Sequence, residues 1–246
     1  MFSSAVPVYK VSNLRQATQW YRNVLGFREV PEEPRKAAPF TRMARDRVEV
    51  LFREADGFPR QSNNPWDAYV RLTGVDVLYR QIRQKAEVRR GPEDTFHGDR
   101  EIEVRDRNGF VLTFGEWGQK PSDRVAMYTI HPVLAVADVD ETTAWYQETL
   151  GFQGEPWSAV PPYEFAMLKR DTVQIFFQKA DVLHKEAGRP FGWDVYFRVV
   201  EGALQTVYDQ VKGRASVLRE PEETGRGSSE FEIEDCNGYV LCFGAA

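Results

Sequence analysis

The sequence predicts an α+β fold made of two tandem domains, each of which reads β-α-β-β-β twice. Three observations lead to this prediction. The second half of the chain repeats the first, short apolar strands alternate with amphipathic helices, and each half ends with an Asn-Gly turn. A fixed internal period indicates duplicated structural units, and the alternation of strands and helices indicates the fold class.

The internal repeat keeps its register over almost the whole chain. The spacing between matching motifs is 125 residues at first and grows to 127 and then 129, which indicates two short loop insertions. The matching segments are 20–27 with 145–152, 45–48 with 170–173, 66–71 with 193–198, and 106–115 with 235–244. We therefore expect a first domain at 1–118, a polar, proline-containing linker at 119–126 and a second domain at 127–246.

Each domain is expected to begin with a strand and a capped helix. In the first domain an apolar strand at 6–11 precedes Ser12 and Asn13, either of which suits a helix N-cap. The helix runs to Leu25, and Gly26 occupies the position after it, where a left-handed conformation is common. The second domain offers the same features at Asp138 or Asp140 and at Gly151.

The later elements also follow one order in both domains. Strands at 48–53 and 67–72 are followed by a helix at 75–85 and a hairpin across Asn108-Gly109. Their counterparts are strands at 173–178 and 194–199, a helix at 203–212 and a hairpin across Asn237-Gly238. Because Asn-Gly accepts positive φ values, we expect a type I′ turn in each hairpin.

Composition excludes several classes of function. The net charge is −5, and the sequence pI is near 5.4, whereas nucleic-acid and anionic-membrane surfaces require basic faces. The N-terminus lacks the pattern of a signal peptide, and Cys236 and Cys242 are too few for a disulfide framework. We expect a cytoplasmic protein that binds neither nucleic acid nor membranes.

Two motifs resemble a known family. They are WYxxxLGF, at 20–27 and 145–152, and DxNGxxLxFG, at 106–115 and 235–244. The chain resembles the vicinal-oxygen-chelate superfamily, also called the glyoxalase/bleomycin-resistance/dioxygenase proteins. The resemblance implies that βαβββ modules form a curled mixed sheet, with helices outside and a cup-shaped ligand pocket inside. It implies a monomer with internally paired domains or a homodimer.

The resemblance also implies where a metal would bind. In family members that use a metal, four strands of a domain supply the ligands, which are usually His or Glu. Carried over, these positions are Val6, Leu51, Asp67 and Thr113 in the first domain and His131, Phe176, Asp194 and Cys242 in the second. A two-residue slip on one strand would substitute Glu49 and Gln174. We expect no metal and no cofactor; the alternative metal ligands are His131, Asp194 and Cys242.

Strand alternation indicates which side chains face the cup. In the first domain the charges on this face sum to zero, and in the second they sum to about −3, which favours a cationic ligand there. The alternative is that the glutamates face water. Trp66 and Trp193 either stack on a planar ligand or pack a domain contact. His97 and His184 are expected in loops without a catalytic triad.

The predicted function is binding of a small cationic or aromatic molecule without a metal. The alternatives are a metal-dependent lyase, isomerase or dioxygenase that uses the second domain, and a scaffold with decayed pockets. The side chains expected to contact the ligand are Glu49, Leu51, Trp66, Asp67, Tyr69, Arg71, Thr113, His131, Gln174, Phe176, Trp193, Asp194, Tyr196, Arg198, Glu232 and Cys242.

Overall fold

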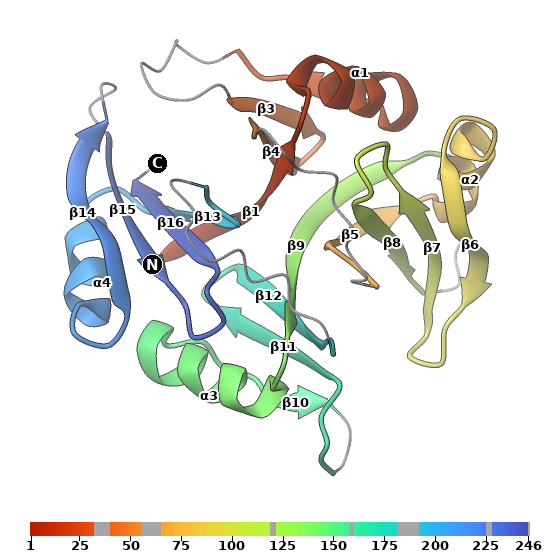
Figure 1. Cartoon of the computed structure of the whole chain (residues 1–246). Helices are drawn as coiled ribbons and strands as arrows, with labels where there is room; N and C mark the ends of the chain where they lie inside the picture. Colours follow the sequence, from red (N-terminus) through yellow and green to blue (C-terminus); the bar gives the residue numbers. More distant parts are fainter. Residues whose placement is uncertain are drawn as a thin grey trace. The chain divides into compact units, whose positions relative to one another are not determined.

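The structure is a computed structural model of the whole chain (Figure 1). It describes residues 1–31, 40–55, 65–118, 122–157, 160–181, 192–224 and 228–245. Residues 119–121 of the predicted linker and His184 lie outside these ranges. Among the described residues, none of the helices combines the length and the apolar character that crossing a bilayer requires.

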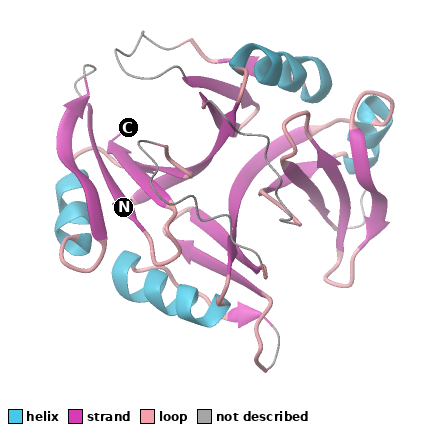
Figure 2. Cartoon of the chain, viewed as in Figure 1, coloured by secondary structure: helices cyan, strands magenta, loops and turns pink. Residues whose placement is uncertain are grey.

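Four helices and sixteen strands form within the described ranges, which confirms the predicted α+β class (Figure 2). The helices are α1 (Leu14–Leu25), α2 (Val75–Ile82), α3 (Val139–Leu150) and α4 (Leu204–Val211). The strands of the first repeat are β1 (Phe2–Val11), β2 (Arg28–Glu29), β3 (Phe40–Arg45), β4 (Val48–Glu54), β5 (Ala68–Thr73), β6 (Glu87–Asp94), β7 (Asp99–Arg105) and β8 (Val111–Trp117). Those of the second are β9 (Ala126–Val136), β10 (Pro156–Trp157), β11 (Phe165–Arg170), β12 (Val173–Lys179), β13 (Val195–Val199), β14 (Ser216–Thr224), β15 (Ser228–Glu234) and β16 (Val240–Ala245).

The first helix of each repeat begins and ends at predicted residues. Of the two candidate caps in the first repeat, the structure uses Asn13, whose Oδ1 accepts a hydrogen bond from the Gln16 backbone N–H at 2.9 Å. In the second repeat it uses Asp138. Gly26 and Gly151 follow the helices with φ values of 71° and 65°, the left-handed conformation that glycine adopts most readily.

The strands form two eight-stranded mixed sheets. One has the order β14-β15-β16-β13-β1-β4-β3-β2, and the other β10-β11-β12-β9-β5-β8-β7-β6. Parallel pairs such as β5 with β8 and β13 with β16 occur beside antiparallel hairpins such as β7 with β8. The first module of the chain thus shares a sheet with the last one.

The chain divides into two compact units, each with its own core. One unit is Tyr9–Ile130, and the other joins Met1–Val8 to His131–Ala246. In the first, helices α1 and α2 bury Tyr21, Leu25 and Leu78 against the sheet. In the second, the start of β1 pairs with β13, and Phe2 lies in the core beside α3 and α4. Each unit therefore contains one repeat and a short strand segment from the other half.

The predicted hairpins form, but the turn type differs from the prediction. Gly109 and Gly238 have positive φ values of 89° and 83°, whereas Asn108 and Asn237 are not among the non-glycine residues with positive φ. A type I′ turn needs positive φ at both central positions, so that prediction was wrong. Asp106 instead accepts hydrogen bonds from the N–H groups of Asn108 and Phe110, which stabilises a longer loop.

Candidate functional site

A polar cluster lies on one face of the sheet in the unit Tyr9–Ile130. Along β5, the apolar residues 68, 70 and 72 belong to the core, so Tyr69 and Arg71 project from the opposite face. The Tyr69 hydroxyl lies 2.8 Å from Asp99 Oδ2 and 2.7 Å from Glu101 Oε1. Arg71 pairs with the same Asp99 oxygen. Asp99 and Glu101 are each only 1% exposed, so this is a buried ionic network.

Two bulges in β6 bring Arg90 into the cluster. The register of β6 against β7 shifts on both sides of Arg90. Its Nη2 then lies 2.8 Å from Glu101 Oε2 and 3.1 Å from Glu103 Oε1. Trp66 donates its indole N–H to Glu103 at 2.9 Å. A bulge re-aims a side chain that strict alternation would place elsewhere, so Arg90 joins carboxylates from the neighbouring strand.

The surroundings of Tyr69 and Arg90 shift the pKa values of both side chains upward. Burial, and then the negative charge of Glu101, raise the pKa of Tyr69 above its ordinary value, so the hydroxyl stays protonated and donates. Burial alone would lower the pKa of Arg90, but its hydrogen bond to Glu93 and the neighbouring carboxylates raise it above its ordinary value. The guanidinium therefore remains charged.

The other unit repeats this cluster on β13, β14 and β15. Tyr196 donates to Glu230 at 3.0 Å, and Trp193 donates to Glu232 at 2.7 Å. Arg219 lies 2.8 Å from Glu232 and 3.5 Å from Glu230. The register shifts of β14 against β15 fall on both sides of Arg219, as they do around Arg90. The two repeats thus share a scaffold of one tryptophan, one tyrosine, one arginine and two glutamates.

A glycine makes room for the tyrosine in both clusters. A Cβ atom added to Gly115 would lie 1.8 Å from the Tyr69 hydroxyl oxygen, and one added to Gly244 would lie 1.9 Å from that of Tyr196. Side-chain atoms do not approach so closely. The buried tyrosine therefore requires a glycine at this position of β8 and of β16.

Asp67 and Asp194, which were predicted to contact the ligand, accept hydrogen bonds from backbone N–H groups. Asp67, just before β5, accepts a hydrogen bond from the Val111 N–H at 2.7 Å. Asp194, just before β13, accepts one from the Val240 N–H at 2.8 Å. Each aspartate thus holds the start of the neighbouring parallel strand, a role that strand alternation did not predict.

The residues at the family's metal positions do not fit a metal. Val6, Leu51 and Phe176 have no donor atom, and the carboxylates of Asp67 and Asp194 accept backbone N–H groups. The sheet order also separates the predicted alternative set, because His131 lies on β9 in one sheet whereas Cys242 lies on β16 in the other. His131, Asp194 and Cys242 do not come together on one sheet.

The other residues predicted to contact the ligand lie on the strands expected from the sequence. Phe176 is 3% exposed and stacks on His131, with ring centroids 5.1 Å apart. Thr113 and Cys242 are fully buried, and the Arg198 guanidinium lies 3.5 Å from the Ser4 hydroxyl. Glu49 and Leu51 lie on β4, and Gln174 lies beside Phe176 on β12.

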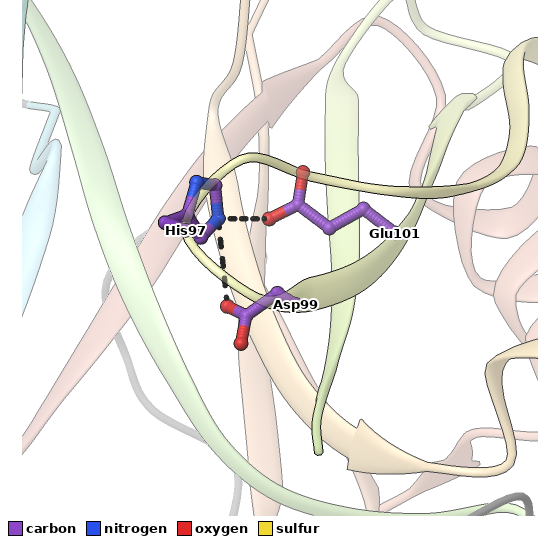
Figure 3. A group of neighbouring side chains, drawn as sticks. All are labelled: His97, Asp99 and Glu101. Carbon is purple, nitrogen blue, oxygen red and sulfur yellow. Dashed lines mark hydrogen bonds and ion pairs between the residues drawn. The ribbon is translucent and has the colours of Figure 1, made fainter. Parts of the chain in front are cut away.

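A group with metal-ligand chemistry lies at the turn between β6 and β7 (Figure 3). His97 Nε2 is 3.1 Å from Glu101 Oε1 and 3.6 Å from Asp99 Oδ2. One ligand atom from each of the three residues lies within 4.8 Å of the others. Sequence reasoning placed His97 in a loop, as the structure does, but missed this group. The signal available for two of the three residues was their spacing, since Asp99 and Glu101 are alternate residues of β7 and share one face.

The glutamates of both clusters do not face water as the alternative interpretation held. Glu101, Glu230 and Glu232 are 1%, 2% and 7% exposed. The count of about −3 for the second domain omitted Arg219, which pairs with two of its glutamates. Arg90 was missed for the same reason, because neither arginine lies on a strand whose alternation was analysed.

The fold and the duplicated polar face define an α+β protein built from paired βαβββ modules. Residues 6–114 match the family model for the Glyoxalase/Bleomycin resistance protein/Dioxygenase superfamily. No curated protein matches the sequence. The first repeat thus matches this superfamily, also called the vicinal-oxygen-chelate superfamily, and the second repeat carries the same motifs.

Solved structures share this fold over nearly the whole chain. A glyoxalase I mutant from Zea mays has a TM-score of 0.70 at 14% identity, covering 99% of this chain and 92% of its own. Glyoxalase I from Zea mays itself gives a TM-score of 0.68 at 14% identity, with coverage of 99% and 92%. A putative dioxygenase from Bacillus subtilis gives 0.68 at 11% identity, with coverage of 99% and 84%. At these identities the likeness concerns the fold alone.

Proposed function

We propose that this protein binds a small cationic or aromatic organic molecule without the metal that family members often use. The observation that carries this proposal is the chemistry of the family's ligand positions. Valine, leucine and phenylalanine at positions 6, 51 and 176 offer no lone pair, and a metal site needs three or four donors. The alternative function, a metal-dependent lyase, isomerase or dioxygenase, requires donors at these positions.

The polar clusters support a cationic ligand. In each cluster one arginine pairs with two glutamates, so negative charge is in excess. The side chains of Glu103 and Glu232 are 15% and 10% exposed, so each remains partly accessible to a ligand. The neighbouring Trp66 and Trp193 add aromatic surface beside that charge. An amine near an aromatic face gains both ionic and cation–π attraction.

Two dyes of opposite charge test the proposal. Acridine orange is planar and cationic, and fluorescein is planar and anionic, so fluorescence anisotropy separates charge from aromatic stacking. We expect the cationic dye to bind at least about tenfold more tightly, since this corresponds to one favourable ionic contact of about 1.4 kcal/mol. Equal binding of the two dyes would contradict the proposed charge preference.

Matched variants locate the binding. Glu103→Gln and Glu232→Gln remove one charge from equivalent positions in the two repeats. Each is expected to weaken binding of the cationic dye, and the larger effect marks the repeat that binds it. Native mass spectrometry of the purified protein adds a second readout, namely any organic molecule retained from the cell. Turnover that depends on added metal at the family positions would overturn the proposal.

A further inference from the structure

We infer that His97, Asp99 and Glu101 form a binding site for a divalent transition metal, with Zn²⁺ as its simplest occupant. The site lies at the turn between β6 and β7, which is not a family ligand position. The inference does not rest on the proposed function, because it concerns a different class of ligand and adds His97 and Asp99, although Glu101 belongs to both sites. Its basis is the geometry and charge of the cluster, a buried oxygen without a hydrogen-bond partner among the described residues and a comparison with the second repeat.

The spacing of the three donors suits a metal ion. Bond lengths of about 2.1 Å in a tetrahedral site place neighbouring ligand atoms about 3.4 Å apart. His97 Nε2 lies 3.1 Å from Glu101 Oε1 and 3.6 Å from Asp99 Oδ2. Figure 3 shows the imidazole nitrogen directed at both carboxylate oxygens. The lone pair of a neutral imidazole therefore points to the place where an ion would contact all three atoms.

The two carboxylate oxygens that face His97 share one hydroxyl proton. The Tyr69 hydroxyl contacts both Asp99 Oδ2 and Glu101 Oε1, yet it carries a single proton. The other shared contact of these two oxygens is His97 Nε2. Two buried carboxylates close to each other repel unless a positive charge lies between them. A metal ion bound by the imidazole and the two carboxylates supplies positive charge at this place.

A buried oxygen of Asp99 also lacks a partner. The Asp99 side chain is completely buried, and its Oδ1 has no hydrogen-bond partner among the described residues. A buried carboxylate oxygen without a partner is destabilising, and such atoms are uncommon in folded proteins. A carboxylate that binds a metal through both oxygens would satisfy this atom.

The charge of the cluster matches a divalent ion. Four carboxylates, those of Glu93, Asp99, Glu101 and Glu103, face the guanidinium groups of Arg71 and Arg90, so the sum is 2 − 4 = −2. Arg71 shares the Asp99 oxygen, but it also lies over the Tyr69 ring at 4.8 Å and the Trp117 ring at 5.7 Å. These rings hold Arg71 in place while the carboxylate binds an ion.

The second repeat provides an internal comparison. With the 129-residue offset, Ser228 occupies the position of Asp99 and Arg226 that of His97, whereas Glu230 retains the position of Glu101. The sequence of the second repeat therefore keeps the scaffold glutamate and lacks the other two donors. The metal chemistry was added to, or lost from, a shared scaffold at two positions.

The test is a zinc titration of the full, untagged chain after treatment with a chelator. Isothermal titration calorimetry with Zn²⁺ is expected to give one equivalent per chain, and Co²⁺ is expected to show a visible d–d absorption band at the same stoichiometry. His97→Ala and Asp99→Ser should each weaken Zn²⁺ binding by at least about tenfold, since even indirect partners of a metal contribute this much. Glu101→Gln should weaken it as well.

Glu230→Gln is the matched control, because Glu230 has the same scaffold contacts in the second repeat. It is expected to leave Zn²⁺ affinity unchanged. His97 is partly exposed, so His97→Ala keeps the fold, and circular dichroism verifies this. The inference fails if the wild type binds less than one equivalent, if His97→Ala and Asp99→Ser bind as the wild type does, or if Glu230→Gln weakens binding equally.

Discussion

The β5–β8 region of the first repeat and the β13–β16 region of the second present one scaffold with two chemistries. Both bury a tyrosine against a glycine, and both join a tryptophan to a glutamate and an arginine. Glutamates Glu101 and Glu230 occupy equivalent positions in the two repeats. In the first repeat, the carboxylate of Asp99 and the imidazole of His97 also lie next to Glu101. The difference shows that the end of one strand decides the charge of the cluster, while the strands themselves decide its shape.

The largest expected effect comes from removing the shared glutamate's charge. The buried Glu101 side chain accepts hydrogen bonds from Tyr69 and Arg90 and lies beside His97. Glu101→Gln should lower the free energy of unfolding by about 3 kcal/mol, because it breaks a buried ion pair. Glu230→Gln should lower it by about half as much, since Arg219 lies closer to Glu232 than to Glu230. Urea denaturation followed by circular dichroism measures both, and equal losses would break the comparison.

The contact between a tyrosine and a glycine is the same in both repeats, so its removal should affect both repeats equally. Gly115→Ala and Gly244→Ala each force a Cβ against a tyrosine hydroxyl. Each should destabilise the protein by about 2 kcal/mol, the usual effect of overpacking a buried site. Because the two approach distances are nearly equal, the two losses in urea midpoint should match. A tolerated alanine at either position would contradict the close approach.

The turn aspartates predict a pH dependence that both repeats share. Burial raises the pKa of Asp106 and of Asp235 to about 6, against the hydrogen bonds that they accept. A raised folded-state pKa means that the native state holds the proton more tightly, so this stability is present below about pH 4 and is lost as pH rises through about 6.

Asparagine variants isolate this titration. Relative to wild type, Asp106→Asn and Asp235→Asn should each gain about 2 kcal/mol of stability between pH 4 and pH 7, because the wild-type carboxyl ionises over that range and the amide does not. Urea midpoints at the two pH values give this difference. A wild-type-to-variant difference that stays constant with pH would show that the aspartates ionise normally.

The smallest expected effect concerns the helix caps. Asp138 accepts hydrogen bonds from two backbone N–H groups at the start of α3, whereas Asn13 accepts one at the start of α1. Asp138→Ala should destabilise by about 1.5 kcal/mol and Asn13→Ala by about 1 kcal/mol. Thermal unfolding resolves the order. A larger loss for Asn13→Ala would contradict the difference in capping.

Sequence reasoning predicted the fold better than the site, for a physical reason. Helix caps, glycine positions and strand alternation are local properties, so Asn13, Gly26 and the buried face of β5 were predictable. The roles of Asp67 and Asp194 were not, because their backbone partners lie more than forty residues away in the chain. Arg90 and Arg219 were missed because the sequence analysis predicted no strand at their positions, and the irregular register of these strands would have hidden the pattern.

The sequence by itself determined the helices, the strands with regular alternation and the repeat of the two halves, because these follow from backbone preferences and periodic burial within a few residues. The tertiary structure alone decided which strands share a sheet, including the pairing of the start of β1 with β13. It also decided that His97, Asp99 and Glu101 meet under Tyr69. Such contacts depend on the register between strands, which long-range packing selects and local sequence does not.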